Sequence, residues 1–206
     1  MQFANLLFFF IIIIPSAIIH EYAHAWMADY LGDSTAKDLG RLTLNPISHI
    51  DPFGTILLPL IFFLFSVLLP GQQTFIFAYA KPVPYNPYNL RDQKYGPAWI
   101  ALAGPGVNLF LAIIFGLVIR FTPYSQLTNF FYLIVFANLL LFVINMIPLP
   151  PLDGAKIVSI FQPNYERYFS GFGFLLVLIF LFTIGFRLVF LIINLLFGLI
   201  VGQPLY

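Results

Sequence analysis

Long apolar runs, separated by short polar and proline-rich connections, make up most of this chain. The runs cover about 3–30, 53–69, 99–121, 130–147 and 169–201. An α-helix needs roughly 20 apolar residues to cross a bilayer, and most of these runs are near that length. The last run is too long for one crossing, and Gly185 with Arg187 divides it into two halves, so we expect a hairpin of two helices. The pattern predicts an all-α polytopic membrane protein with about six membrane segments.

Composition agrees with a membrane location. The chain is 61% hydrophobic and 8% charged, whereas soluble domains contain about 25% charged residues. The first run lacks a basic start and a small-residue cleavage site, so we expect a retained helix and not a secretory signal. Cysteine is absent, so only nitrogen and oxygen atoms are available to hold a metal. The net charge of +1, without a basic run, gives no indication of a nucleic acid partner.

A His-Glu-x-x-His motif, formed by His20, Glu21 and His24, follows the first apolar stretch directly. A charged side chain near the middle of a membrane helix costs about 2.5–3.5 kcal/mol on insertion scales, and such residues usually face an internal partner or cavity. Positions i and i+4 share one face of a helix, so both histidines can face one metal ion. Glu21 lies beside that face, which suits a carboxylate that accepts a proton from water.

A catalytic zinc site normally has three protein ligands, so the two histidines need one more. The candidates are His49, Asp51, Asp153 and Glu166. Asp153 is favoured because it lies in an Asn-x-x-Pro-x-Pro-Pro-Leu-Asp-Gly segment at 145–154, where prolines break a membrane helix. On its own this segment fits an ordinary interfacial turn equally well. We interpret His49 as a loop residue or a neighbour of the site.

The basic residues suggest how the chain crosses the membrane. Seven of the nine Lys and Arg residues occur in the connections between apolar runs, as Lys37, Arg41, Lys81, Arg91, Lys94, Lys156 and Arg167. The positive-inside rule assigns these connections to the cytoplasm. Residues 53–80 must then enter the membrane and return, as a re-entrant segment or a short β-hairpin between the first and third helices. This topology brings Asp153 to the side of His20 and His24, with the site toward the cytoplasmic half.

The two ordered motifs together resemble the site-2 protease family of intramembrane metalloproteases. Residues 103–108 also resemble that family's Gly-Pro-x-x-Asn helix start, and residues 80–87 resemble a segment of its compact prokaryotic members. The likeness covers about 3–156, and we see no PDZ-like or CBS-like domain. We therefore expect a single domain at 1–206, with a catalytic core at 1–156 and a carboxy-terminal helical hairpin at 157–206.

The resemblance implies a zinc-dependent endopeptidase of the cell membrane that hydrolyses a peptide bond within or near a transmembrane segment of a substrate protein. His20, His24 and Asp153 would hold one Zn²⁺ per chain, and Glu21 would act as the base. Asn145, and more weakly Asn108, are predicted to bind the substrate backbone, although each also fits a residue that hydrogen-bonds a neighbouring helix. A strand at 73–80 could pair with the substrate.

The sequence leaves other function classes open. A transporter or proton channel would also bury His and Glu, but the sequence shows no repeated halves. A non-catalytic metal-binding scaffold would not need a base, yet Glu21 is present. A zinc hydrolase of a non-peptide substrate is the harder alternative, because zinc and a base do not define the bond that is cleaved.

Overall fold

The structure is a computed structural model, and it describes residues 3–57, 60–61, 80–169 and 171–205. These residues are helical or irregular, and none of them forms a strand. Helices long and apolar enough to cross a membrane cover Ile11–Tyr30, Gly96–Phe121, Gln126–Asn145 and Gly173–Val201. The prediction of an all-helical membrane protein agrees with this part of the chain. Most of the predicted segments at 53–69 and 73–80 lie outside the described residues.

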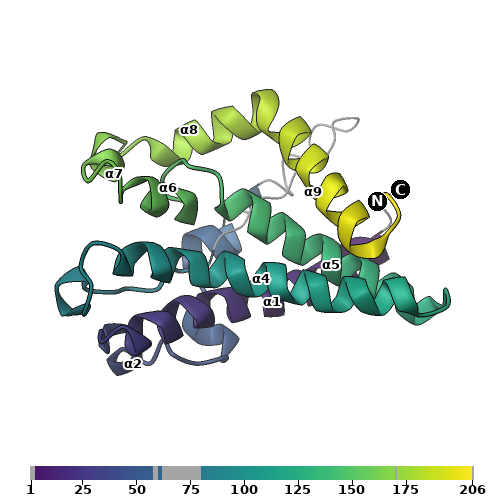
Figure 1. Ribbon diagram of the computed structural model, residues 1–206, viewed down its shortest axis with the longest axis horizontal. Helices are drawn as coiled ribbons and strands as arrows, with labels where there is room; N and C mark the ends of the chain where they lie inside the picture. Colours follow the sequence, from purple (N-terminus) through teal and green to yellow (C-terminus); the bar gives the residue numbers. More distant parts are fainter. Residues whose placement is uncertain (1–2, 58–59, 62–79, 170, 206) are drawn as a thin grey trace.

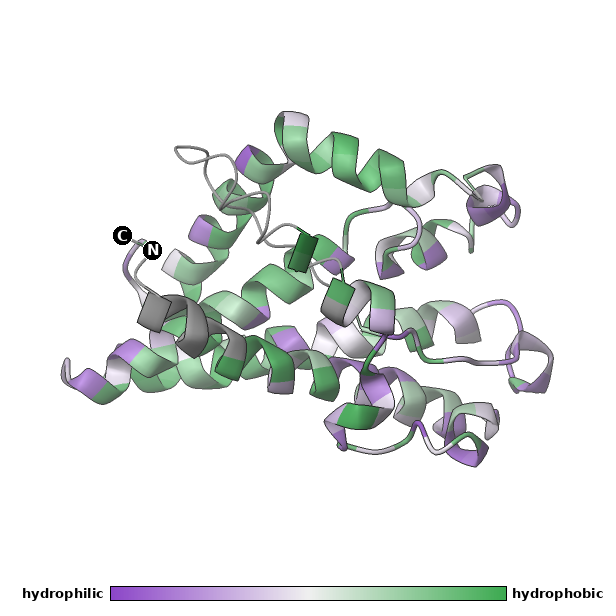
Figure 2. Ribbon diagram, turned by 180° about the vertical axis from the view of Figure 1, so that it is seen from behind, coloured by the Kyte–Doolittle hydropathy of each residue, from purple (hydrophilic) through white to green (hydrophobic). Residues whose placement is uncertain are grey.

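Three helices form the centre of the bundle. They are α1 (Phe3–Tyr30), α4 (Gly96–Phe121) and α5 (Gln126–Asn145), and α4 packs against both of the others (Figure 1). The last helix, α9 (Phe186–Val201), packs against α5 and α4. Apolar residues dominate the long helices, and polar residues gather on the connections (Figure 2). Large apolar side chains such as Phe110 and Leu195 stay exposed, as expected for helices that face lipid.

Local signals explain where α4 and α5 begin, which is earlier than the predicted starts at 99 and 130. In α4, a proline in the first turn needs no hydrogen-bond partner for its nitrogen, and the helix starts at Gly96. In α5, Ser125 and Thr128 form a capping box in which each side chain accepts a hydrogen bond from the other residue's backbone. The first residues of α5 are partly polar, so the apolar run alone predicted a later start.

The predicted hairpin of the carboxy-terminal run is not confirmed. A π-helical turn, η4 (Leu181–Gly185), joins α8 (Gly173–Phe180) to α9, and the backbone stays right-handed helical at both ends of the turn. The result is a bend between α8 and α9 (Figure 1). The 29 residues of this segment would be about 44 Å long as a straight helix at roughly 1.5 Å per residue, and the bend shortens the distance between its ends. Gly185 therefore marks a bulge and not a reversal.

A buried carboxylate ties the connection before α4 to the end of α1. Asp33 is fully buried, and its Oδ2 accepts a hydrogen bond from the Asn86 backbone N at 2.7 Å. Its Oδ1 accepts another from Asn89 Nδ2 at 2.8 Å. The backbone N of Arg91 donates to Leu31 O at 3.0 Å in the same region. These contacts fix residues 85–91 beside the cytoplasm-facing end predicted for α1.

We expect Asp33→Asn to lower the unfolding midpoint more at pH 7 than at pH 3. Burial would raise the pKa of the Asp33 carboxyl, but hydrogen bonds from Thr35, Asn86 and Asn89 outweigh burial and hold it below 3.8. A lowered folded-state pKa stabilises the protein above the unfolded pKa, and this contribution is lost as the pH falls through the folded pKa. Thermal unfolding in detergent measures the difference. For a protein of this size, the unfolding midpoint shifts by about 2–4 °C for each kcal/mol of lost stability. The exposed Asp38→Asn is the control, and an equal loss at both pH values contradicts the argument.

Candidate metal centre

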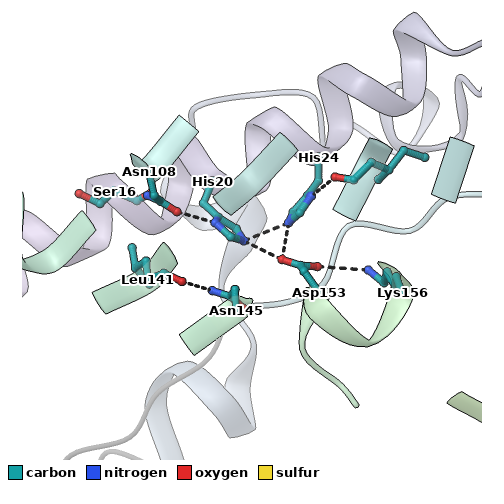
Figure 3. Close-up of polar contacts among 9 residues, drawn as sticks. Ser16, His20, His24, Asn108, Leu141, Asn145, Asp153 and Lys156 are labelled. Carbon is teal, nitrogen blue, oxygen red and sulfur yellow. Dashed lines mark hydrogen bonds and ion pairs between the residues drawn. The ribbon is translucent and has the colours of Figure 1, made fainter. Parts of the chain in front are cut away.

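His20 and His24 lie one turn apart on α1, and both side chains point toward α4. Their Nε2 atoms are 3.0 Å apart, and the two rings meet edge to face at an interplanar angle of 87°. Both residues are buried, with 5% and 6% of their surface exposed. The i, i+4 spacing predicted from the sequence thus gives two ring nitrogens that face one point (Figure 3).

Asp153 reaches the histidines from the first residue of α6 (Asp153–Val158). Its Oδ2 lies 3.2 Å from His20 Nε2 and 3.1 Å from His24 Nε2. Gly154 permits this position, because a Cβ there would lie 2.5 Å from Met146 O and 2.6 Å from Ile147 O. The start of α6 can therefore rest directly on the end of α5. The broken-helix segment brings its carboxylate to the histidine pair, as drawn in Figure 3.

Gly104 of α4 leaves the space in which the rings meet. A Cβ at this position would overlap His24 Nε2 and would lie 2.6 Å from His20 Nε2. The neighbouring Pro105 is fully buried within the same helix. Gly104 therefore forms the wall of the site, and the motif that resembles a helix start lies within α4.

The hydrogen bonds on the far side of each ring define which nitrogen is free. His20 Nδ1 donates to Asn108 Oδ1 at 2.6 Å, and His24 Nδ1 donates to Ile100 O at 2.6 Å. Both Nε2 atoms then present lone pairs toward the negatively charged Asp153 Oδ2. Such an arrangement of acceptors repels itself unless a proton or a metal ion lies between them. Two imidazole nitrogens and one carboxylate oxygen fit a zinc ion, so the donor set agrees with the implied metal.

Lys156 holds the other oxygen of the carboxylate. Its Nζ donates to Asp153 Oδ1 at 3.4 Å and lies 5.7 Å from the centre of the Tyr85 ring. Burial would lower the pKa of the Lys156 ammonium, but the charge of Asp153, assisted by Tyr85 and Glu166, raises it above the usual range. The lysine thus stays charged and leaves Oδ2 to face the histidines.

Three other predicted ligand candidates serve elsewhere. His49 donates from Nε2 to Thr43 O at 2.8 Å, and Asp51 Oδ1 accepts from the backbone of Phe53 and Gly54. Glu166 accepts a hydrogen bond from Ser159 Oγ at 3.2 Å. Among the described residues, only His20, His24 and Asp153 form a cluster that could hold a metal.

The remaining predicted residues differ in their surroundings. Glu21 is half-buried on α1. Within the described part of the chain, its carboxylate makes no hydrogen bond or ion pair. Asn145 ends α5 and donates to Leu141 O at 2.9 Å. Asn108 is fully buried, and its amide contacts His20, Asn138 and Ser16. These contacts agree with the helix-to-helix alternative, and its substrate contact stays a prediction.

Comparison with known proteins identifies the family. Residues 122–184 match the model of peptidase family M50. The chain is also 37% identical over 187 residues to "Putative zinc metalloprotease YwhC" of Bacillus subtilis (strain 168). The aligned residues cover 84% of this chain and 79% of the relative. The chain belongs to peptidase family M50. M50 is the site-2 protease family, so the predicted family and the metalloprotease class are confirmed, and the transporter and scaffold alternatives lose support.

More distant relatives are matched over less of their length. "Putative zinc metalloprotease Rip2" of Mycolicibacterium smegmatis (strain ATCC 700084 / mc(2)155) is 29% identical over 176 residues, covering 82% of this chain and 64% of the relative. Rip2 of Mycobacterium tuberculosis (strain ATCC 25618 / H37Rv) is 29% identical over 157 residues, covering 74% of this chain and 56% of the relative. No solved structure matches the chain at a significant level.

Proposed function

We propose that this M50 peptidase is an intramembrane zinc endopeptidase that hydrolyses a peptide bond within or near a transmembrane segment of a substrate protein. The observation that carries the proposal is the meeting of His20 Nε2, His24 Nε2 and Asp153 Oδ2 within 3.2 Å of one another. These buried atoms lie among membrane-spanning helices. The relatives' names support zinc as the metal, and one such cluster among the described residues supports one ion per chain.

Each polar residue then has a defined task in hydrolysis. Zinc, when bound, polarises a carbonyl and lowers the pKa of water to about 7. Glu21 accepts the proton of the attacking water as the new C–O bond forms. It then delivers that proton to the amide nitrogen as the C–N bond breaks. Asn108 and the Ile100 carbonyl hold the two imidazole rings in place throughout.

Asn145 is our candidate for binding the substrate. A transmembrane helix hides its amide bonds within its own hydrogen bonds, so the segment to be cut must unwind and needs new partners. Asn145 is half-buried at the end of α5, directly before the segment that carries Asp153. Its Oδ1 has no hydrogen-bond partner in the described part of the chain, so it is available to accept from a substrate N–H.

We further propose a multi-pass arrangement with the site toward the cytoplasm. The short helix α2 (Thr35–Asp38), the connection before α4, and α6 all lie at one end of the bundle, and both termini lie at the other (Figure 1). Basic residues concentrate at the first end, as Lys37, Arg41, Lys81, Arg91, Lys94 and Lys156. The positive-inside rule supports a cytoplasmic location for that end.

The test is cleavage of a panel of transmembrane peptides by purified, zinc-loaded protein in detergent. We expect cleavage that a chelator lowers by about 100-fold or more and that added zinc restores. In the same series, Asn145→Ala should raise KM while kcat is largely kept, because binding of the unwound segment is uniform in the ground and transition states.

Two results would contradict the proposal. A native protein that binds no zinc removes the metal site. A protein that binds zinc, cuts no peptide of the panel, and hydrolyses a non-peptide ester instead would assign the site to another bond. An unchanged KM in Asn145→Ala removes only the substrate role of that residue.

A further inference from the structure

A chain of buried polar side chains connects three helices and ends at the metal centre. Asn138 of α5 donates from Nδ2 to Ser16 Oγ of α1 at 3.1 Å, and its Oδ1 accepts from Asn108 Nδ2 of α4 at 2.9 Å. Asn108 Oδ1 in turn accepts from His20 Nδ1 at 2.6 Å. Asn108 and Asn138 are both 0% exposed. Figure 3 shows the link from Asn108 to His20, with Ser16 beside Asn108.

The hydrogen-bond partners fix the direction of both amides. Asn138 Nδ2 also donates to Ile134 O at 2.9 Å, so both of its N–H groups face acceptors and its oxygen must face Asn108. Asn108 Nδ2 donates to Asn138 Oδ1 and to Ser16 O at 3.4 Å, so its own oxygen faces His20. A rotation of either amide by 180° would place donors against donors.

We propose that Asn138 is a positioning residue for the metal centre, which orients the Asn108 amide so that its oxygen accepts the Nδ1 proton of His20. This hydrogen bond keeps the proton on Nδ1 and leaves the lone pair of Nε2 for the metal. Asn138 touches neither metal nor substrate and acts through Asn108. The inference rests on the proposed role of His20 as a zinc ligand.

A simpler role for Asn138 would be to hold helices together, which is a common use of asparagine in membranes. The two roles predict different results. A residue that only joins helices changes stability and leaves zinc affinity as it is. A positioning residue changes zinc affinity, and its effect disappears once Asn108 is already lost, because residues that act through one another are not additive.

The experiment measures zinc affinity in detergent by competition with a chromogenic chelator, for Asn138→Leu, Asn108→Leu and the double variant. We expect a loss of about tenfold for Asn138→Leu and about 10- to 100-fold for Asn108→Leu. The double variant should bind no more weakly than Asn108→Leu. The visible spectrum of the Co²⁺-loaded protein should change in both single variants. Asn194→Leu, which removes an exposed asparagine of α9, is the control and should bind as the native chain does.

Native zinc affinity in Asn138→Leu, or additive losses in the double variant, would overturn the proposal. If Asn138→Leu does not fold, as judged by gel filtration, Ser16→Ala replaces it, because that change removes only the hydroxyl to which Asn138 donates. We expect Ser16→Ala to lower zinc affinity about threefold, because the hydrogen bond from Asn138 to Ser16 is the contact of this chain furthest from the metal. His20→Ala separates the two proposals. If His20→Ala binds zinc as tightly as the native chain, the metal site itself is refuted. If His20→Ala loses zinc but Asn138→Leu binds it normally, only the positioning role of Asn138 is refuted.

Discussion

Glu21→Gln should lower kcat for peptide cleavage by about 10²- to 10⁴-fold while zinc stays bound, because a positioned general base contributes that much and glutamine cannot accept the proton. The metal should be unaffected, since His20, His24 and Asp153 supply the clustered donor atoms. Glutamine keeps the size of the side chain at its half-buried position on α1. Peptide cleavage rates and zinc content of the same preparation check both parts of the expectation.

The matched control is Glu166→Gln, which neutralises a carboxylate that contacts Ser159 and lies outside the metal cluster. This variant should cleave at the native rate. If Glu21→Gln loses zinc together with activity, Glu21 is a ligand and not the base. If it cleaves at the native rate, another group accepts the proton.

The sequence was most informative where chemistry and helix geometry coincide. The spacing of His20 and His24 places both on one face of any helix, and the broken segment at 145–154 favours Asp153 among the candidate third ligands. The structure brings these three side chains together. Family membership could also be anticipated, since two ordered motifs are more specific than either alone, and the comparisons confirm it.

Other features depended on three-dimensional packing that a single sequence does not contain. The apolar run alone cannot say whether Gly185 reverses the chain or bulges it, and the result is a π-helical turn. Likewise, the role of Asn108 depends on which face of α4 meets α1. Asn138 was missed entirely, although an asparagine within an apolar membrane helix is itself a signal of an internal partner.

Asp33 was missed for a similar reason. It follows the first helix in a polar connection, where a carboxylate is ordinarily solvated. Thr35 supplies local hydrogen bonds to this carboxylate, but Asn86 and Asn89 of a distant segment supply two more, and the side chain is fully buried. Contacts between segments more than 50 residues apart leave no local pattern to read.

Gly104→Ala should abolish tight zinc binding while the protein still folds. The added methyl group would overlap His24 Nε2 and press on His20 Nε2. Both atoms lie at the ends of side chains, so the rings can rotate away at the cost of their hydrogen bonds to Asn108 and Ile100, and α4 can keep its place. Alanine also favours the helix over glycine by about 1 kcal/mol, which opposes unfolding. The displaced rings no longer face Asp153, and we expect zinc affinity to fall by about 100-fold or more, because here the ligands themselves move.

Gly106→Ala provides the comparison, because it lies two residues further along α4 and no atom lies within 4 Å of the added Cβ. This variant has the same gain in helix propensity, and it should bind zinc as the native chain does and unfold at an equal or higher temperature. Chelator competition and thermal unfolding on both variants separate a filled metal site from a disturbed helix. Equal zinc affinity in the two variants would mean that the space beside Gly104 is not where the metal binds. A loss of folding in Gly104→Ala alone would mean that α1 and α4 separate before the rings rotate.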